Sequence, residues 1–404
     1  MNAPDSQALK LRISPRAESA VRGGHPWIFS DSVTKQNREG IAGEYAIVYD
    51  RNNSFLCIGL YDPNSPLRVR VLHSGKPQTL DDAWWSAHWN ETVERRKSLF
   101  DDQTTGYRCC NGESDGWPGF IVDRYDATLV LKLYTAAWFP HLKRILSLLT
   151  PFSERVVLRL SRNIQDSAKS HSLADGQVIF GKPLEGPVRF LENGIAFQAD
   201  VERGQKTGFF LDQRDNRKRV GALSAKRDIL NVFSFAGGFS LAAAAGGARS
   251  ATDLDISAHA LEQAKRNFDL NRETAAIAQC QHACIQANAF DWLKSAESGK
   301  YDLIILDPPS LAKREAERAE AVRAYGFLVK QALQLLRKKG ILVAASCSAH
   351  VSEEEFFSTV QESIRRGNRT FQVLETTGHP PDHPATFPEA RYLKCIYIGM
   401  DSGR

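Results

Sequence analysis

The segment that decides the fold is Tyr301-Asp-Leu-Ile-Ile-Leu-Asp-Pro-Pro-Ser310, an apolar run that ends on a carboxylate and two prolines. Such a short apolar run is typical of a strand buried on both faces of a parallel sheet. Proline cannot continue the hydrogen bonding of a sheet, so the chain must turn at Pro308 and Pro309. Asp307 is therefore predicted at the strand's carboxyl end, the edge where open α/β sheets bind ligands.

A second stretch near the C-terminus repeats this pattern. Gly340-Ile-Leu-Val-Ala-Ala345 is another short apolar segment, and Ser346-Cys-Ser348 follows it directly. If both strands belong to one parallel sheet, Asp307 and Cys347 bring a carboxylate and a thiol to the same crevice. Taken singly, each residue is equally compatible with a structural role, because most lone cysteines are inert core residues.

Residues 228–255 predict the nucleotide-binding half of a Rossmann-type sheet. The strand Asp228-Ile-Leu-Asn-Val-Phe233 leads into a glycine turn, Ser234-Phe-Ala-Gly-Gly-Phe-Ser240, which opens an alanine-rich helix. The next strand, Ala251-Thr-Asp-Leu-Asp255, ends in an acid about twenty residues after the turn, the usual spacing for a ribose contact. The turn is equally compatible with a tight strand-to-helix corner that binds nothing.

The glycine turn favours one class of ligand. It lacks the G-x-G-x-x-G pattern that cradles a pyrophosphate, so a dinucleotide fits poorly. S-Adenosylmethionine carries adenosine without phosphates and fits better. We expect this cofactor over Ala236, Gly237 and Gly238, with Asp255 accepting hydrogen bonds from both ribose hydroxyls and Asn288 bonding an adenine edge.

The rest of the chain predicts smaller units. Residues 9 to about 75 alternate in polarity between Gly, Pro and Asn clusters, as in a small β domain. A helix is expected over 80–100, a small α/β unit over 107–187, and a hairpin over 186–198 around Asn193-Gly194. No element is assigned to 162–178.

Basic and aromatic residues gather in the N-terminal region. Arg68 lies on a segment whose strand face is predicted to be basic, and Arg16, His25 and Trp27 precede it. This combination is the footprint of RNA binding, although a solvated rim around a core tryptophan has the same composition.

The composition sets further limits. The chain is 42% hydrophobic and 25% charged, as in ordinary globular proteins. Its 404 residues are enough for two or three domains. No run reaches the length of a membrane span and Met1-Asn-Ala-Pro-Asp-Ser6 is polar, so a cytoplasmic protein is expected.

The seven scattered cysteines predict no disulfides, and Cys280-Gln-His-Ala-Cys284 lacks a second ligand pair, so no metal is expected. The net charge of +5 permits a polyanionic partner without requiring one.

The two strand ends suggest a specific chemistry. Carbon 5 of a pyrimidine accepts a methyl group only after a thiolate has added to carbon 6, which makes carbon 5 an enamine-like nucleophile. An acid beside the ring stabilises the developing charge. Cys347 and Asp307 are the two groups that this reaction needs, and the target base must leave its stack to reach them.

Several motifs together resemble the RlmI-type ribosomal RNA large-subunit cytosine-C5 methyltransferases. They run in order along nearly the whole chain: His25-Pro-Trp-Ile-Phe29, Glu113-Ser-Asp-Gly116, Gly204-Gln-Lys-Thr-Gly-Phe-Phe-Leu-Asp-Gln-Arg214, Asn231-Val-Phe-Ser-Phe-Ala-Gly-Gly-Phe239, Asp255-Ile-Ser257, Leu306-Asp-Pro-Pro309, Ser346-Cys-Ser348, Asp382-His-Pro384 and Tyr392-Leu-Lys394.

The resemblance implies an α/β fold in three parts, namely a small β PUA domain that binds RNA (1–75), a small α/β central domain (76–186) and a Rossmann-like S-adenosylmethionine methyltransferase domain (187–404). It implies a homodimer that acts on large-subunit ribosomal RNA. Cys347 is then the nucleophile, Asp307 contacts the base, and a loop from Gln205 to Arg214 closes over the cofactor. The implied cofactor residues are Gln205, Lys206, Thr207, Asp212, Arg214, Phe233, Ala236, Gly237, Gly238, Asp255, Asn288 and Asp307. The implied RNA contacts are Arg16, His25, Trp27, Arg68, Pro308, Pro309 and Ser310.

Two other functions stay open. An RNA guanine N-methyltransferase of this fold needs no thiol, but it commonly carries a stacking aromatic after Asp-Pro-Pro, where this chain has Ser310. A non-catalytic RNA-binding or assembly factor would keep the fold without needing the glycine turn or Asp255. Binding of S-adenosylmethionine separates this last reading from the two enzymes.

Overall fold

The computed structural model describes residues 8–401, so the polar N-terminal hexapeptide considered above lies outside the described part. The chain divides into two compact units, each built from several segments. The first unit comprises Met1–Phe190, Ala199–Leu211 and Pro381–Phe387, and the second comprises Leu191–Gln198, Asp212–Pro380 and Pro388–Arg404. Within the described residues, every helix is too short or too polar to cross a bilayer.

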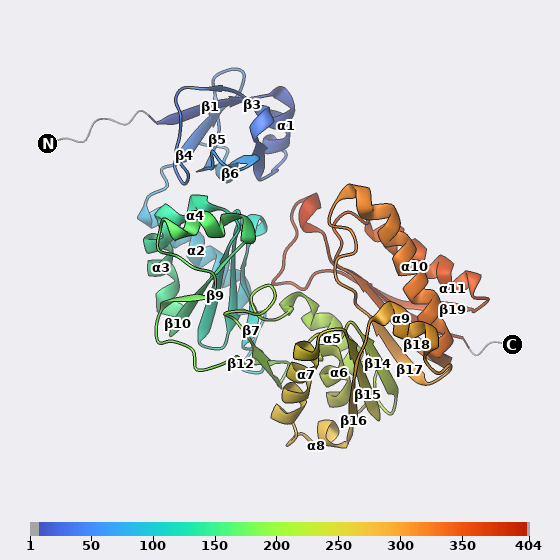
Figure 1. The fold of residues 1–404 in the computed structure, drawn as a ribbon. Coiled ribbons are helices and arrows are strands. Elements are labelled where there is room, and N and C mark those ends of the chain that lie inside the picture. The colour runs from blue at the N-terminus through green and yellow to red at the C-terminus, as the bar shows by residue number, and fades with distance from the viewer. Residues whose placement is uncertain (1–7, 402–404) are drawn as a thin grey trace. The chain divides into compact units, whose positions relative to one another are not determined.

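The first unit opens with a six-stranded sheet, which confirms the predicted N-terminal β domain (Figure 1). Its strands are β1 (Leu9–Ile13), β2 (Trp27–Phe29), β3 (Val33–Gln36), β4 (Tyr45–Tyr49), β5 (Phe55–Tyr61) and β6 (Leu67–Ser74). They lie in the order β2-β6-β5-β4-β1-β3. Helix α1 (Pro15–Arg22) follows β1, because Ser14 caps it and proline suits the first helical turn.

A second, five-stranded sheet follows in the same unit. Its strands are β7 (Gly106–Asn111), β8 (Phe120–Tyr125), β9 (Thr128–Leu133), β10 (Arg155–Leu160) and β11 (Gln177–Phe180), in the order β11-β10-β9-β8-β7. Its helices are α2 (Asp82–Lys97), α3 (Leu142–Leu149) and α4 (Gln165–Lys169). Helix α2 begins as predicted, since the Asp81 side chain accepts from the Trp84 amide at 2.9 Å. Four buried tryptophans contribute to the core around this sheet: Trp85, Trp89, Trp117 and Trp138.

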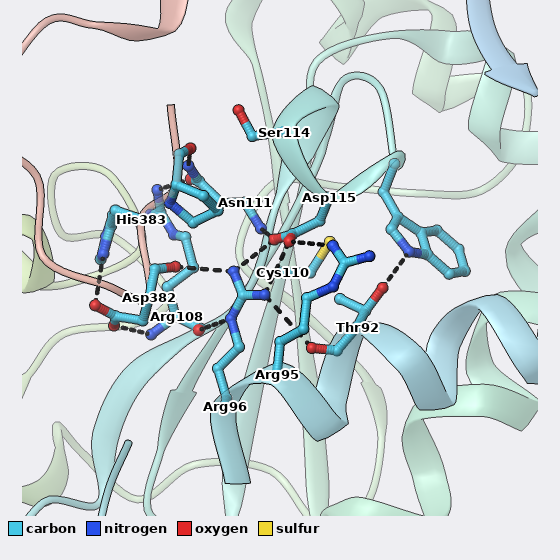
Figure 2. A network of polar contacts seen from close by, with 12 residues as sticks. Thr92, Arg95, Arg96, Arg108, Cys110, Asn111, Ser114, Asp115, Asp382 and His383 are labelled. Carbon is cyan, nitrogen blue, oxygen red and sulfur yellow. Dashed lines mark hydrogen bonds and ion pairs between the residues drawn. The ribbon is translucent and has the colours of Figure 1, made fainter. Parts of the chain in front are cut away.

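A buried polar cluster, which we call the Asp115 network, lies beside this core and consists of Arg96, Arg108, Asp115 and Asp382 (Figure 2). Asp115 accepts two hydrogen bonds from the Arg96 guanidinium, at 2.8 and 2.5 Å. Arg96 also donates to the Asp382 carbonyl at 3.0 Å, and the Arg108 amide donates to the Asp382 carboxylate at 3.0 Å. These bonds hold Pro381–Phe387 in the first unit.

The predicted hairpin is confirmed. It pairs β12 (Val188–Glu192) with β13 (Ile195–Ala199). Asn193 and Gly194, at the turn, have φ of 51° and 78°. Left-handed backbone at both central residues is the type I′ turn that Asn-Gly favours.

The second unit is organised around a seven-stranded sheet, which confirms the predicted Rossmann-type fold. Its strands are β14 (Asp228–Val232), β15 (Ser250–Asp255), β16 (Gln281–Gln286), β17 (Tyr301–Leu306), β18 (Leu336–Ser346), β19 (Phe371–Thr377) and β20 (Lys394–Met400). Their order is β16-β15-β14-β17-β18-β20-β19. The first five are parallel, and β20 is antiparallel to both β18 and β19.

Helices connect these strands, and the sheet core is apolar. The helices are α5 (Arg214–Ala222), α6 (Gly238–Ala245), α7 (Ala258–Leu270), α8 (Ala275–Gln279), α9 (Ala289–Ser295), α10 (Arg318–Leu335) and α11 (Glu353–Arg366). Short 3-10 turns occupy Ser30–Ser32, Gly112–Asp115, Ala136–His141, Thr150–Phe152, Arg162–Ile164, Leu211–Gln213, Glu315–Glu317 and Pro388–Ala390. Leu303, Ile304 and Ile305 are fully buried, as the sequence predicts for a parallel strand covered on both faces.

Candidate active site

The carboxyl ends of five neighbouring parallel strands carry the predicted residues of the second unit. Asn288 follows β16, Asp255 ends β15, the glycine turn 233–238 follows β14, Asp307 follows β17 and Cys347 follows β18. The chain places β15 and β16 on one side of β14, and then places β17 and β18 on the other side. The order of the strands therefore reverses between β14 and β17. Ligands in open α/β sheets bind at such a switch point, so the sheet order places Asp307 beside it.

The strand register fixes the neighbours of Asp307. Leu306 pairs with Val232 of β14 on one side and with Ala344 of β18 on the other. The Asp307 amide donates to the Val232 carbonyl at 3.4 Å. The acid therefore follows a fully paired strand between the glycine turn and the segment that carries the cysteine.

Cys347 lies in a short segment, Ser346–Ser348, which we call the thiol loop. Its Sγ is 3.9 Å from the carbonyl oxygen of Pro308, in the Asp-Pro-Pro turn. Cys347 and Asp307 are both half-buried, so neither is sealed in the core. The structure thus brings together the cysteine and the Asp-Pro-Pro turn, as the sequence predicted.

Hydroxyl groups fasten the thiol loop to the Asp-Pro-Pro turn. The Ser348 Oγ accepts hydrogen bonds from the amides of Leu311 at 3.1 Å and Ala312 at 3.3 Å. The buried Tyr325 hydroxyl lies 3.0 Å from the Ser348 Oγ and 2.9 Å from the Ser346 Oγ. These residues were missed as site-forming by the sequence analysis, although the two serines flank the predicted nucleophile.

The predicted base-contacting turn takes part in the same contacts. Pro308 is buried, Pro309 is exposed and Ser310 is half-buried. The Ser310 Oγ lies 3.3 Å from the Ser348 Oγ and donates to the Ala312 carbonyl at 3.2 Å. Ser310 therefore helps to join the two loops, and its predicted contact with RNA stays a prediction.

A buried lysine supports the thiol loop from the other side. Strand β20 pairs with β18 so that Lys394 lies opposite Ser346. Only 2% of Lys394 is exposed, and its Nζ donates to the carbonyl oxygens of Ser348, at 2.6 Å, and Val351. Burial lowers the pKa of the Lys394 ammonium to about 8. The motif Tyr392-Leu-Lys394 was recognised in the sequence, but no role was assigned to it.

The glycine turn is shaped by backbone conformations that most residues avoid. Phe233, Phe235 and Gly237 have φ of 62°, 49° and 73°. Asp255 holds the turn, because its carboxylate accepts from the Phe235 amide at 2.9 Å and from the Ser257 amide at 2.8 Å. Each carboxylate oxygen has a further lone pair, so Asp255 can still accept hydrogen bonds from ribose hydroxyls. Strained backbone of this kind clusters at ligand sites.

One observation fits an adenosine cofactor at this turn, and a second explains its glycine. The Ser234 Oγ is buried without a hydrogen-bond partner among residues 8–401, which leaves a polar atom for a ligand. A Cβ on Gly237 would lie 2.8 Å from the Ala264 Cβ and 2.9 Å from the Asp253 Oδ2. Glycine is therefore needed for the turn to pack against α7. Ala236 is buried and Gly238 opens α6, where the sequence expected them.

Asn288 has a structural task that the sequence analysis did not foresee. It is exposed, and its Oδ1 accepts from the Phe290 amide at 2.9 Å, which caps the N-terminus of α9. Its expected bond to an adenine edge stays a prediction.

The expected cofactor loop is divided between the units. Gln205, Lys206 and Thr207 belong to the first unit. Gln205 is exposed, whereas Thr207 is fully buried and donates to Asp123 at 2.6 Å. The Lys206 carbonyl accepts from Lys132 at 3.1 Å. This half of the loop is firmly held by its own unit, and its cofactor contacts stay a prediction.

The other half of that loop belongs to the second unit. Asp212 is buried and accepts a 2.8 Å hydrogen bond from the Tyr392 hydroxyl. Arg214 is also buried, and its Nε lies 3.0 Å from the Asp215 carboxylate. The predicted contacts of Asp212 and Arg214 with the cofactor also stay predictions.

Two of the predicted RNA residues of the first unit, His25 and Trp27, belong to an aromatic cluster. Trp27 lies edge-on to His25 at 5.6 Å and to Phe387 at 5.2 Å between ring centroids, and all three are within the first unit. The Trp27 indole donates to Glu113 at 2.9 Å. Arg16 is exposed on α1. Phe387 is buried, whereas His25 and Trp27 are half-buried, and the predicted RNA contacts of this unit stay predictions.

The interpretation of β6 as carrying a basic face needs a correction. Arg68 is half-buried and donates to the carbonyl oxygens of Asp62, at 3.2 Å, and Pro63. Arg70 is only 6% exposed and lies 3.5 Å from Glu113. Arg70 is thus buried beside the carboxylate of Glu113, which is distant in the sequence. The alternation of polar and apolar residues along β6 does not reveal this pairing.

Ligand-type side chains also meet beneath the glycine turn. The His282 Nε2 lies 2.8 Å from the Asp253 Oδ2 and 3.8 Å from the Cys284 Sγ. The ring of Phe268 stacks on His282 at 3.7 Å. Burial opposes charge on His282, but hydrogen bonding to Asp253 and Cys284 outweighs it and raises the pKa of His282 to about 9. We interpret the contact as a buried ion pair. The raised pKa keeps His282 protonated near neutral pH, and its Nε2 shares that proton with the Asp253 carboxylate.

Comparison with known proteins agrees with this geometry. A model of S-adenosylmethionine-dependent methyltransferases matches residues 142–398, and a model of PUA-like domains matches 11–74. A relative from Deinococcus radiodurans, named "Ribosomal RNA large subunit methyltransferase", is 55% identical over 99% of this chain and 100% of its own length. One from Aeromonas salmonicida, named "Ribosomal RNA large subunit methyltransferase I", is 33% identical over 96% and 98%.

Solved structures support the same fold. A SAM-dependent methyltransferase from Streptococcus mutans superposes with a TM-score of 0.79 at 22% identity, covering 96% of this chain and 99% of its own. A methyltransferase structure complexed with SAH superposes with a TM-score of 0.81 at 23% identity, over the same shares.

Proposed function

We propose that this chain, which belongs to the S-adenosylmethionine-dependent ribosomal RNA large subunit methyltransferase family, forms 5-methylcytosine in large-subunit ribosomal RNA. The observation that carries the proposal is the half-buried Cys347 thiol, 3.9 Å from the Pro308 carbonyl of the Asp-Pro-Pro turn. The names of the relatives support the RNA substrate, and the cysteine supports carbon 5. We further propose that the enzyme works in the cytoplasm as a homodimer, as the resemblance implies.

The side chains supply covalent catalysis. The Cys347 thiolate adds to carbon 6 of a cytosine that has left its stack, and carbon 5 becomes nucleophilic. Asp307, acting as an acid beside the ring nitrogen, would donate a proton and so neutralise the negative charge that develops when the thiolate adds. Phe233–Gly238 and Asp255 would hold S-adenosylmethionine, whose sulfonium would supply an electrophilic methyl group to carbon 5 and leave as S-adenosylhomocysteine. The proton on carbon 5 then goes to a base, the bond from sulfur to carbon 6 breaks, the ring nitrogen returns its proton to Asp307, and the Cys347 thiolate is restored.

The experiment that tests this function compares wild type with Cys347→Ala on ribosomal RNA from a strain that lacks the enzyme. We expect mass mapping to find one new 5-methylcytosine with wild type and none with the variant. Calorimetry should show equal binding of S-adenosylmethionine, since Cys347 is not a cofactor contact in this account.

The matched control is Cys284→Ala, because Cys284 is also half-buried but lies beneath the glycine turn. It should retain methyl transfer. Full activity of Cys347→Ala would eliminate the covalent route, and methyl groups found on guanine nitrogen would identify the alternative enzyme.

A further inference from the structure

The contacts of Lys394 differ from those of an ordinary buried lysine. Its ammonium group donates to the backbone carbonyls of Ser348, the last residue of the thiol loop, and of Val351, shortly after it. Strand pairing with Ser346 fixes the lysine under this loop. The cation is therefore held next to the backbone of Cys347 by two acceptors that carry no net charge.

The other charged and titratable groups around this loop come from four elements. Glu353 and Glu355, on α11, act on Lys394 together with Cys347 and favour its charged form. Asp307 follows β17, and Tyr325 of α10 lies under the two serines. Cys395, next to Lys394 on β20, is fully buried and its pKa is raised by burial. Glu353 is exposed, and Glu355 is paired with Arg318 of α10 at 2.8 Å. A carboxylate near a thiol opposes its ionisation, and a nearby cation offsets that effect.

Hydrogen bonding alone does not explain a lysine at this position. Two carbonyl oxygens can be satisfied by a neutral amide or hydroxyl donor, whereas burial of an ammonium group is costly. A positive charge beside a cysteine lowers the pKa of the thiol, and the thiolate is the nucleophile.

We propose that Lys394 is a positioning residue for Cys347, which it serves by fixing the thiol loop and by stabilising the thiolate with its charge. This role rests on the proposed covalent function. The lysine is buried under the loop, so its effect passes through the sulfur.

The test is the pH profile of Cys347 alkylation by iodoacetamide, read by mass spectrometry of the peptide that contains Cys347. Wild type is compared with Lys394→Met, which keeps the length and removes the charge, and with Lys394→Arg, which keeps the charge. We expect a wild-type midpoint below the ordinary cysteine value of about 8.5. Lys394→Met should raise it by about one pH unit, and Lys394→Arg should restore most of the difference.

A matched control is Lys313→Met, which removes the same charge from an exposed residue just beyond the Asp-Pro-Pro turn. Solvent screens this charge, so the midpoint should stay at the wild-type value. An unchanged midpoint in folded Lys394→Met overturns the proposal. A wild-type midpoint at or above about 8.5 overturns it as well, even if the variant fails to fold. Neither result touches the covalent function, which the activity of Cys347→Ala tests separately.

Discussion

The Asp115 network and the thiol loop are both buried and polar, but they balance charge in different ways. In the Asp115 network a guanidinium faces a carboxylate at 2.5 Å, so each charge is neutralised by a direct partner. Under the thiol loop, the Lys394 ammonium instead donates to two carbonyl oxygens, beside a group that can become an anion.

This difference separates a structural cluster from a reactive one. A paired charge has its field cancelled at short range and contributes mainly to holding segments together, as with Pro381–Phe387 in the first unit. A cation on neutral acceptors keeps its field, which can then shift the ionisation of a neighbour.

The largest effect is expected from Asp115→Asn. The change leaves the Arg96 guanidinium buried without its carboxylate, and breaking such a pair costs about 3–5 kcal/mol of unfolding free energy. Urea unfolding of wild type and variant measures it. The control is Glu91→Gln, which removes an exposed partner of Arg95 and should cost less than about 1 kcal/mol. Equal costs for the two variants would show that the network is not a buried ion pair in solution.

The Asp253–His282 pair is an intermediate case, because its charge depends on pH. The pKa of His282 is raised to about 9 in the folded chain, above an unfolded value of about 6.5. Its stabilisation, roughly 3 kcal/mol, is therefore fully present below pH about 6.5 and is lost as pH rises through about 9.

The measurement is the stability of wild type minus that of His282→Gln between pH 6 and 10. We expect this difference to shrink as pH rises. His350→Gln is the control, since His350 is exposed beside Glu315 and should change stability by less than about 0.5 kcal/mol at any pH. A difference that is flat or grows with pH contradicts the assignment of an ion pair.

A smaller effect is expected from Ser348→Ala. The Leu311 and Ala312 amides lose their acceptor, which costs about 1–3 kcal/mol and loosens the link between the thiol loop and the Asp-Pro-Pro turn. Methyl transfer should fall while the alkylation midpoint of Cys347 stays within about 0.3 pH units of the wild-type value, because no charge changes.

The control Ser358→Ala, which removes an exposed hydroxyl of α11, should leave methyl transfer and the alkylation midpoint at wild-type values. A large shift of the midpoint in Ser348→Ala would mean that the hydroxyl cluster, rather than Lys394, sets the ionisation of the thiol.

Local signals in the sequence were enough to predict the elements that carry the site. The apolar run before Asp307 forms a fully buried parallel strand, and Asn193-Gly194 forms the expected turn, because each pattern acts over a few residues. The alternation of strand and helix predicted a Rossmann-type sheet in the second unit, since crossover connections allow few arrangements.

Long-range partners were beyond such signals. Lys394 acts on a carbonyl 46 residues away, and only the antiparallel pairing of β20 with β18 places it there. Arg96 and Asp382 are 286 positions apart. The segment of β6 was predicted to have a basic face, but Arg70 on it is paired with Glu113, which is distant in the sequence. Sequence periodicity reports which face of an element is buried, but it does not report which polar groups meet inside.

The covalent claim has one direct test, which is to incubate the enzyme and S-adenosylmethionine with RNA in which 5-fluorocytosine replaces the target cytosine. Fluorine at carbon 5 cannot leave as the proton does, so the bond between Cys347 and carbon 6 should persist. We predict a protein–RNA adduct on a denaturing gel for wild type and none for Cys347→Ala, with the RNA attached to the peptide that contains Cys347. An enzyme that methylates ordinary ribosomal RNA yet forms no adduct with the fluorinated RNA would contradict the account.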